Sequence, residues 1–252
     1  MEQIEPIKKI RRYVEFIVLI SLILIYGLST YQRNFIWKDD ITLWSDCAKK
    51  SPMKARPHNN LAVFYNGKNL TEQAITEAII ALKLRQNYPN PFISLGDAYL
   101  KKGSPDMAIM AYKNAISIKS DYADAYFSMG NAYAKKGEMD LAIETFKKAL
   151  KLRPNDITVR VNLAVAYGSK GLTDQAIAGL QYALTIKSDS PDIHYNLGVA
   201  YEQLAISIEH GEESGELIVN AINEYKKTLM LNPDDFQAKE RMTKLIAKSK
   251  EQ

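Results

Sequence analysis

Two hydrophobic patterns divide this sequence. Residues 13 to 31 are almost entirely apolar, and Glu15 is their one formal charge. From residue 55 onward, apolar and small residues instead recur every 34 positions among polar ones. The first pattern predicts one membrane-spanning helix, because about 20 apolar residues cross the hydrocarbon core of a bilayer. The second predicts an array of repeated structural units.

The flanks of the apolar stretch indicate its orientation. Four basic residues precede it, and aromatic residues suited to membrane interfaces are found at both of its ends: Tyr13, Tyr26, Tyr31 and Trp37. We expect residues 1–12 to be a cytoplasmic basic tail, residues 13–31 the transmembrane helix, and the remainder to lie in the periplasm or a lumen. A cleaved signal peptide is the alternative, with Gly27 and Ser29 as the small residues before a cleavage site.

The 34-residue period is carried by five kinds of position. With Ala55 as position 1, positions 7 and 11 hold large residues, and positions 8, 20 and 27 hold small ones that let helices approach closely. Position 7 reads Leu61, Leu95, Met129, Leu163 and Leu197, and position 11 reads Tyr65, Tyr99, Tyr133, Tyr167 and Tyr201. Position 8 reads Ala62, Gly96, Gly130, Ala164 and Gly198. Alanine fills positions 20 and 27 in the first four repeats.

Turn residues indicate that each repeat is a helical hairpin. Gly103, Gly137 and Gly171 fall where the first helices should end in a left-handed conformation, and Asn69 takes that place in the first repeat. These features resemble the tetratricopeptide repeat (TPR). The resemblance implies an all-α fold, a right-handed superhelix of helical hairpins, here preceded by one transmembrane helix.

The ends of the array have their own expected elements. Residues 32–54 form a juxtamembrane segment with a half repeat at residues 40–50, in which Cys47 is a small buried packing residue. Five repeats occupy residues 55–235, and residues 236–252 contain a polar-backed capping helix. The fifth repeat has an 11-residue insertion around residues 209–216. We expect a solvated extension there, with an acidic metal or partner site as the alternative.

Composition and motifs exclude several classes of function. One cysteine and three scattered histidines leave no set of ligands for structural zinc. A net charge of +4 gives no reason to expect nucleic acid as a partner. Phosphate-binding glycine loops, metalloprotease helices and nucleophile elbows are absent from the sequence. We therefore expect no enzyme activity, cofactor or metal.

The candidate binding residues lie on the first helix of each repeat. Apolar residues at position 5 run beside amides and hydroxyls at positions 6 and 9, a combination suited to an extended peptide. The candidate groove consists of Asn60, Ile93, Phe127, Asn131, Val161, Asn162, Tyr195 and Asn196. The alternative is that the apolar residues only seal contacts between adjacent repeats.

Two further resemblances concern these residues. Asn60, Asn162 and Asn196 are similar to the amide ladder in the repeats of protein O-linked N-acetylglucosamine transferases, which holds peptide main chain, although Ser94 and Ser128 interrupt it. The carboxylate clamp of chaperone-binding repeats matches poorly, because its basic positions are occupied by residues such as Phe127.

The junction resembles another family. It is similar to the last span and first repeats of multispanning O-mannosyltransferase-like proteins, through Tyr31, Arg33, Asn34, Trp37, Asp39, Trp44, Ser51, Pro52, Lys54, Ala55, Arg56, Pro57, His58, Asn60 and Leu61. Our leading interpretation is a membrane-anchored scaffold that binds a protein or peptide. The alternative is the accessory or substrate-recognition tail of a membrane glycosyltransferase, which would then be a partner.

Overall fold

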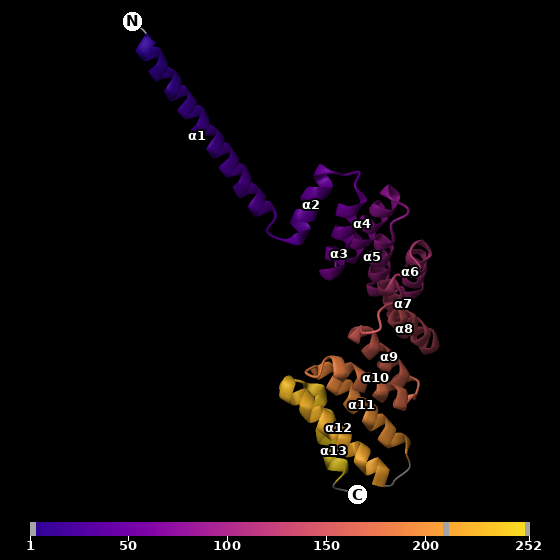
Figure 1. Cartoon of the computed structure of the whole chain (residues 1–252). Coiled ribbons are helices and arrows are strands. Elements are labelled where there is room, and N and C mark those ends of the chain that lie inside the picture. Colours follow the sequence, from indigo (N-terminus) through magenta and orange to yellow (C-terminus); the bar gives the residue numbers. More distant parts are fainter. Residues whose placement is uncertain (1–3, 209–211, 250–252) are drawn as a thin grey trace. The chain divides into compact units, whose positions relative to one another are not determined.

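The computed structural model describes residues 4–208 and 212–249, which form thirteen helices and no strand. The chain divides into two compact units, Met1–Gln86 and Asn87–Gln252 (Figure 1). The N-terminal unit contains four helices: α1 (Ile4–Ile36), α2 (Asp40–Lys50), α3 (Ala55–Gly67) and α4 (Thr71–Leu84). Helices α3 and α4 are the hairpin of the first repeat. The expectation of an all-helical fold is confirmed.

The C-terminal unit contains repeats two to five and a final helix. Its elements are α5 (Pro89–Lys101), α6 (Pro105–Ile118), α7 (Ala123–Lys136), α8 (Met139–Leu152), α9 (Ile157–Ser169), α10 (Thr173–Ile186), α11 (Pro191–Ser207), α12 (Glu212–Leu231) and α13 (Phe236–Lys248). Each helix packs against the next, and the first helices α5, α7, α9 and α11 also contact one another in order. These four helices therefore form one continuous wall of the unit.

The predicted turn residues have the expected backbone conformation. Gly103, Gly137 and Gly171 have φ values of +82°, +84° and +74°, and Asn69 has φ of +59°. Glycine adopts this left-handed conformation without steric cost, and asparagine tolerates it better than most residues. These four positions confirm the hairpin boundaries.

Position 8 is a point of close approach between the two helices of a hairpin. A Cβ atom added to Gly130 would lie 2.5 Å from Cε1 of Phe146, which is itself fully buried on α8. The same arrangement joins Gly96 to Tyr112, where the corresponding distance is 2.4 Å. Each ring occupies the space that a side chain at position 8 would need. In these repeats, a glycine on the first helix is thus covered by an aromatic ring on the second.

Helix α1 has the properties of a membrane span. Residues Arg11–Asn34 are apolar enough to cross a bilayer, with a mean hydropathy of 2.0, and none of this segment is buried. Two of its hydroxyls are satisfied inside the helix, because Ser21 and Thr30 donate to main-chain oxygens four residues earlier at 2.8 Å. Glu15 pairs with Arg11 at 2.9 Å. A signal sequence has the same appearance near an N-terminus.

The structure corrects two details at the ends of the array. Cys47 on α2 is only half-buried, and the neighbouring Ala48 is the residue that packs inward. On the capping helix α13, Ala238 and Leu245 are buried, but the polar side that we expected to face solvent includes a paired residue, Arg241. Its Nη1 lies 2.9 Å from Oε2 of Glu202 on α11, so the last helix is held by an ion pair as well as by apolar contacts.

The fifth repeat accommodates its insertion by lengthening both helices. Helix α11 has 17 residues and α12 has 20, compared with 13 or 14 in the helices of the fourth repeat. Ser214 near the start of α12 donates to the main-chain oxygen of Ala205 at 3.1 Å. Part of the predicted acidic extension, Glu209, His210 and Gly211, lies outside the described residues.

The first and fifth repeats share a buried histidine–glutamate pair. His58 Nδ1 lies 2.6 Å from Glu77 Oε2, and His194 Nδ1 lies 2.6 Å from Glu224 Oε2. In each case the second ring nitrogen faces a main-chain oxygen, of Pro52 or Ser188. The two histidines are four 34-residue steps apart, so they occupy the same register position of the first and fifth repeats.

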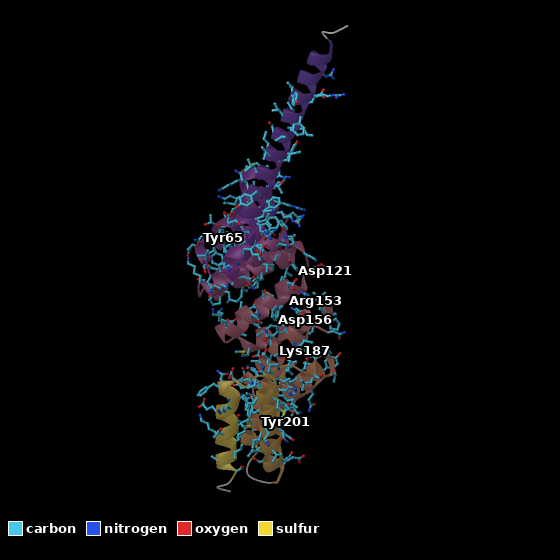
Figure 2. All side chains as sticks on the ribbon, turned by 90° about the vertical axis from the view of Figure 1, so that its left-hand side faces the viewer. Tyr65, Asp121, Arg153, Asp156, Lys187 and Tyr201 are labelled. Atoms are coloured by element: carbon cyan, nitrogen blue, oxygen red, sulfur yellow. The ribbon has the colours of Figure 1, made fainter. Side chains whose placement is uncertain are left out.

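Surface ion pairs also occur where the third repeat meets the fourth. Arg153, after α8, pairs with Asp124 on α7 and lies 3.6 Å from Asp156, the N-cap of α9. Figure 2 shows Arg153 and Asp156 side by side where α8 gives way to α9. Exposed pairs of this kind contribute about 0–1 kcal/mol each.

Candidate functional site

The candidate residues of the C-terminal unit lie along the wall formed by α5, α7, α9 and α11. We call the side that carries positions 5, 6 and 9 the first-helix face. It consists of Ile93, Ser94, Asp97, Phe127, Ser128, Asn131, Val161, Asn162, Val165, Tyr195, Asn196 and Val199. Asn60 has the same register on α3, but it belongs to the N-terminal unit, where Asn59 donates to its side-chain oxygen at 3.5 Å.

The apolar residues at position 5 are partly built into the core. Ile93, Phe127, Val161 and Tyr195 are all half-buried and pack against buried clusters. The Phe127 ring lies 6.1 Å from that of Phe146, and the Tyr195 ring lies 5.9 Å from that of Tyr225, both tilted. These residues therefore contribute to packing between helices, as the alternative interpretation supposed, while part of each remains accessible.

Polar side chains link position 9 of one repeat to position 6 of the next. Asn162 Nδ2 on α9 donates to Asn131 Oδ1 on α7 at 3.1 Å. Asp97 and Ser128 hold the equivalent positions of the second and third repeats. The link is missing at the next junction, because position 9 of the fourth repeat is Val165. Asn196 instead donates to the main-chain oxygen of Asp192, in its own helix, at 2.7 Å.

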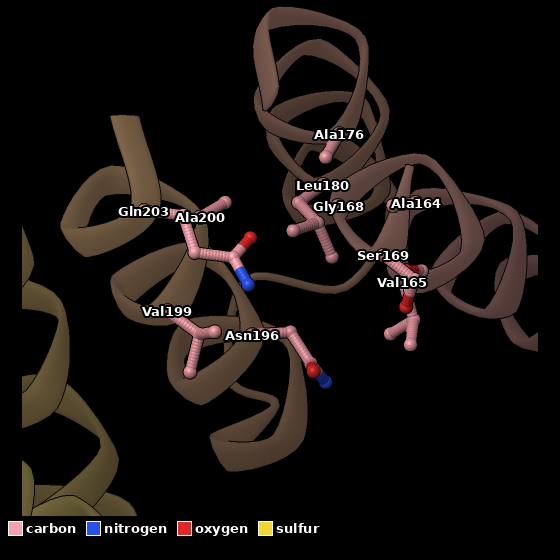
Figure 3. A pocket seen from close by; sticks show the side chains of 10 residues that line it. All are labelled: Ala164, Val165, Gly168, Ser169, Ala176, Leu180, Asn196, Val199, Ala200 and Gln203. Atoms are coloured by element: carbon pink, nitrogen blue, oxygen red, sulfur yellow. Dashed lines mark hydrogen bonds between the residues drawn. The ribbon is translucent and has the colours of Figure 1, made fainter. Parts of the chain in front are cut away.

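A small cavity lies at this unlinked junction. It has a volume of about 80 Å³ and is lined by residues of α9, α10 and α11. In Figure 3 the side chains of Asn196 and Gln203 project from α11 toward Val165 and Ser169 on the facing helix. Its floor is made by Ala164, Ala176 and Leu180. The cavity thus combines an apolar floor with amide groups at its rim.

The charged group of the face has a perturbed acidity. Burial raises the pKa of Asp97, while the hydrogen bond that it accepts from the Tyr112 hydroxyl, at 2.7 Å, opposes this rise. Burial, together with the charge of Asp97, raises the pKa of Tyr112 well above its usual range. The Tyr112 ring covers Gly96 in the second repeat as the Phe146 ring covers Gly130 in the third.

Sequence reasoning missed part of this site. Gln203 lies on α11, and its side chain fits because residue 168 is a glycine, whose added Cβ would lie 3.0 Å from Gln203 Oε1. The position of Gly168 holds Leu100, Ala134 and Glu202 in the other repeats of the unit. Gly168 is the smallest residue at this position, and that is the sequence signal for the space that Gln203 occupies. Among the described residues, no cluster of histidine, cysteine and carboxylate side chains could hold a metal ion.

Family comparisons match the C-terminal unit. Residues 96–137 and 169–204 match a family described as TPR repeat, and residues 123–156 match the tetratricopeptide repeat. A comparison with curated proteins found no match.

Several solved structures share the fold. YrrB, described as a TPR protein with an unusual peptide-binding site, is 21% identical, with a TM-score of 0.59 over 79% of this chain and 97% of that chain. The protein TTC0263 of Thermus thermophilus is 22% identical, with a TM-score of 0.58 over 77% and 99%. MamA of Desulfovibrio magneticus is 16% identical, with a TM-score of 0.60 over 72% and 97%. At these identities the likeness shows the fold alone.

Proposed function

Because this chain is a tetratricopeptide repeat protein, a fold that serves as a scaffold for protein–protein interaction, we propose that it is a membrane-anchored scaffold that binds an extended peptide segment on its first-helix face. The observation that carries the proposal is the cavity between α9 and α11. About 80 Å³ exceeds the roughly 30 Å³ share of one water molecule, so a small apolar side chain fits.

The amides beside the cavity suit a peptide main chain. In each of these three amides, one polar atom makes a hydrogen bond given above. The other atom has no partner among the described residues: Asn131 Nδ2, Asn162 Oδ1 and Asn196 Oδ1. One donor and two acceptors thus lie along three successive first helices. Phe127 and Tyr195 would supply aromatic contacts in the same row, since such residues dominate interface energetics. Asn60 holds the equivalent position in the N-terminal unit.

Affinity measurements with a displayed peptide library test this site. Random peptides would be selected on the full chain, and the binders titrated against Asn131→Ala, Asn162→Ala, Asn196→Ala and the triple variant. We expect each single change to cost about 0.5–1.5 kcal/mol and the triple change to abolish measurable binding. Tyr195→Ala should also weaken binding.

A matched control removes three exposed asparagines from other surfaces: Asn114, Asn223 and Asn232. This variant should bind as tightly as the parent. Melting curves must show that every variant is folded, since Tyr195 also packs against Tyr225. Unchanged affinity in a folded triple variant would move the site off this face.

The anchor is the second part of the proposal. The exposed apolar surface and internally satisfied hydroxyls of α1 support a span at residues 11–34, with the repeats in the periplasm or lumen. Protease added to intact spheroplasts should then digest the repeats, and the chain should resist alkaline extraction. A mature N-terminus near Thr30 would instead identify a signal peptide. No observation in the described part of the chain favours the glycosyltransferase-tail alternative, which stays a prediction from resemblance.

A further inference from the structure

The N-terminal unit contains an open cavity of about 750 Å³ between the end of α1, helix α2 and the start of α3. Four basic residues and two tryptophans are among its lining residues: Arg33, Lys50, Lys54, Arg56, Trp37 and Trp44. These are the only two tryptophans of the chain. Cationic and aromatic side chains are thus concentrated in one cavity, far beyond what the mild overall charge of +4 would suggest.

The positive charge of this cavity is largely uncompensated. Asp46 is the carboxylate of the lining, and it accepts hydrogen bonds from Lys50 Nζ at 2.7 Å and from Trp37 Nε1 at 3.4 Å. The hydrogen bond from Lys50 lowers the pKa of Asp46, so this pair is charged but neutral in sum. Arg33, Lys54 and Arg56 have no carboxylate partner in the part of the chain that the structure describes. An anion entering the cavity would therefore meet three unpaired cations.

The cavity begins where the apolar segment ends. Arg33 lies in the last turn of α1, and the segment able to cross a bilayer extends to Asn34. Trp37 lies three residues further on and is 45% exposed, and tryptophan is typical of membrane–water interfaces. When α1 spans a bilayer, the cavity opens at the level of the lipid headgroups. Each basic residue near such a surface contributes about 1 kcal/mol of attraction to anionic lipids.

We propose that this cavity binds the phosphate of an anionic phospholipid headgroup from the bilayer that α1 spans. Arginine and lysine are the side chains that recognise phosphate oxygens, and arginine does so with paired parallel hydrogen bonds. The adjoining tryptophans give the glycerol and upper acyl region an amphipathic contact that free phosphate would not use. Bound lipid would fix the direction in which α2 and α3 leave the membrane. This inference rests on the proposed anchoring function.

Tryptophan fluorescence tests the cavity directly, because both tryptophans line it. The full chain would be placed in nanodiscs of phosphatidylcholine with increasing fractions of phosphatidylglycerol. We expect the emission to shift to shorter wavelength and to saturate as phosphatidylglycerol increases. The double variant Lys54→Gln, Arg56→Gln should lose this shift over the same range. The control Lys68→Gln, Lys83→Gln removes the same charge from other positions of the same unit and should keep it.

Each of the other possible outcomes would overturn a specific part of the proposal. A shift produced by inorganic phosphate in pure phosphatidylcholine discs would show a free-phosphate site and overturn the lipid assignment. An equal shift in the parent and the Lys54, Arg56 variant would show general surface attraction and overturn the cavity. Incorporation into discs with no lipid-dependent shift would overturn this inference and leave the anchor intact. Failure to incorporate would overturn both.

Discussion

The third and fourth repeats have the same length and register but differ at neighbouring positions of their first helices. In the third, Gly130 is covered by the Phe146 ring, and Asn131 accepts a hydrogen bond from Asn162. In the fourth, Ala164 and Val165 take these places and Leu180 replaces the ring. The cavity of about 80 Å³ lies beside this second arrangement. A cavity on a regular repeat array can therefore arise from a few substitutions. These substitutions remove an aromatic ring from the space between two helices and a hydrogen bond between two repeats.

Gly130→Leu should damage the third repeat more than any other change considered. A Cβ at Gly130 would already overlap Phe146, so a leucine must displace the ring or separate the helices. We expect a loss of about 3 kcal/mol or more, since overpacking costs about 1–3 kcal/mol even in less crowded sites. Chemical denaturation followed by circular dichroism measures it. Ala164→Leu, beside the cavity, should lower the free energy of unfolding by less. Equal decreases in the two variants would show that the two repeats are packed equally tightly at this position.

A double-mutant cycle would convert the third repeat to the arrangement of the fourth. Gly130→Ala and Phe146→Leu should each cost about 1–3 kcal/mol, the first by overlap and the second by leaving a void. Together the smaller side chain makes room for the added methyl group, so we expect a favourable coupling of at least about 1 kcal/mol. Denaturation midpoints of the four proteins give this value. Strict additivity would mean that these positions do not share one space.

The reverse exchange tests the cavity as a binding feature. Leu180→Phe with Ala164→Gly should place a ring where the cavity lies and leave stability close to that of the parent. A peptide side chain that used the cavity would lose its burial, worth about 1.5–3 kcal/mol. We therefore expect selected peptides to bind at least about tenfold more weakly, as titration would show. Unchanged affinity in this folded variant would place the peptide elsewhere on the face.

Asp97→Asn should change stability least, with a defined dependence on pH. Burial raises the pKa of Asp97 in the folded chain, so its contribution to stability is fully present in acid and is lost as pH rises through that raised pKa. Asparagine keeps an acceptor for Tyr112 and matches Asn131 of the third repeat. The variant should gain slightly in stability over the parent at neutral pH and lose this gain in acid. Melting curves from acid to neutral pH would measure the difference in stability between the variant and the parent. A gain in stability confined to acid would contradict the expectation.

The repeat register was largely readable because it is a property of spacing. The left-handed conformations of Gly103, Gly137 and Gly171 follow from where a glycine interrupts an otherwise helical period. The spacing also contains the recurrence of His58 and His194 at one register position. Their pairing with Glu77 and Glu224 is visible only in the structure. Helix α1 was likewise evident from its composition, although its role as an anchor stays a proposal.

Residue order alone was enough to specify that the described chain would be helical, where its hairpins turn, and which positions must stay small, because each of these depends on local backbone preference or on a repeated contact. Packing in three dimensions was needed to establish which amides are already used. Asn162 bonds to a neighbouring repeat, whereas Asn196 bonds to its own helix. Packing also placed Phe127 and Tyr195 on core rings and Gln203 at the border of a cavity. Such choices depend on side chains far apart in the chain competing for the same space and the same hydrogen-bonding atoms, which no local pattern records.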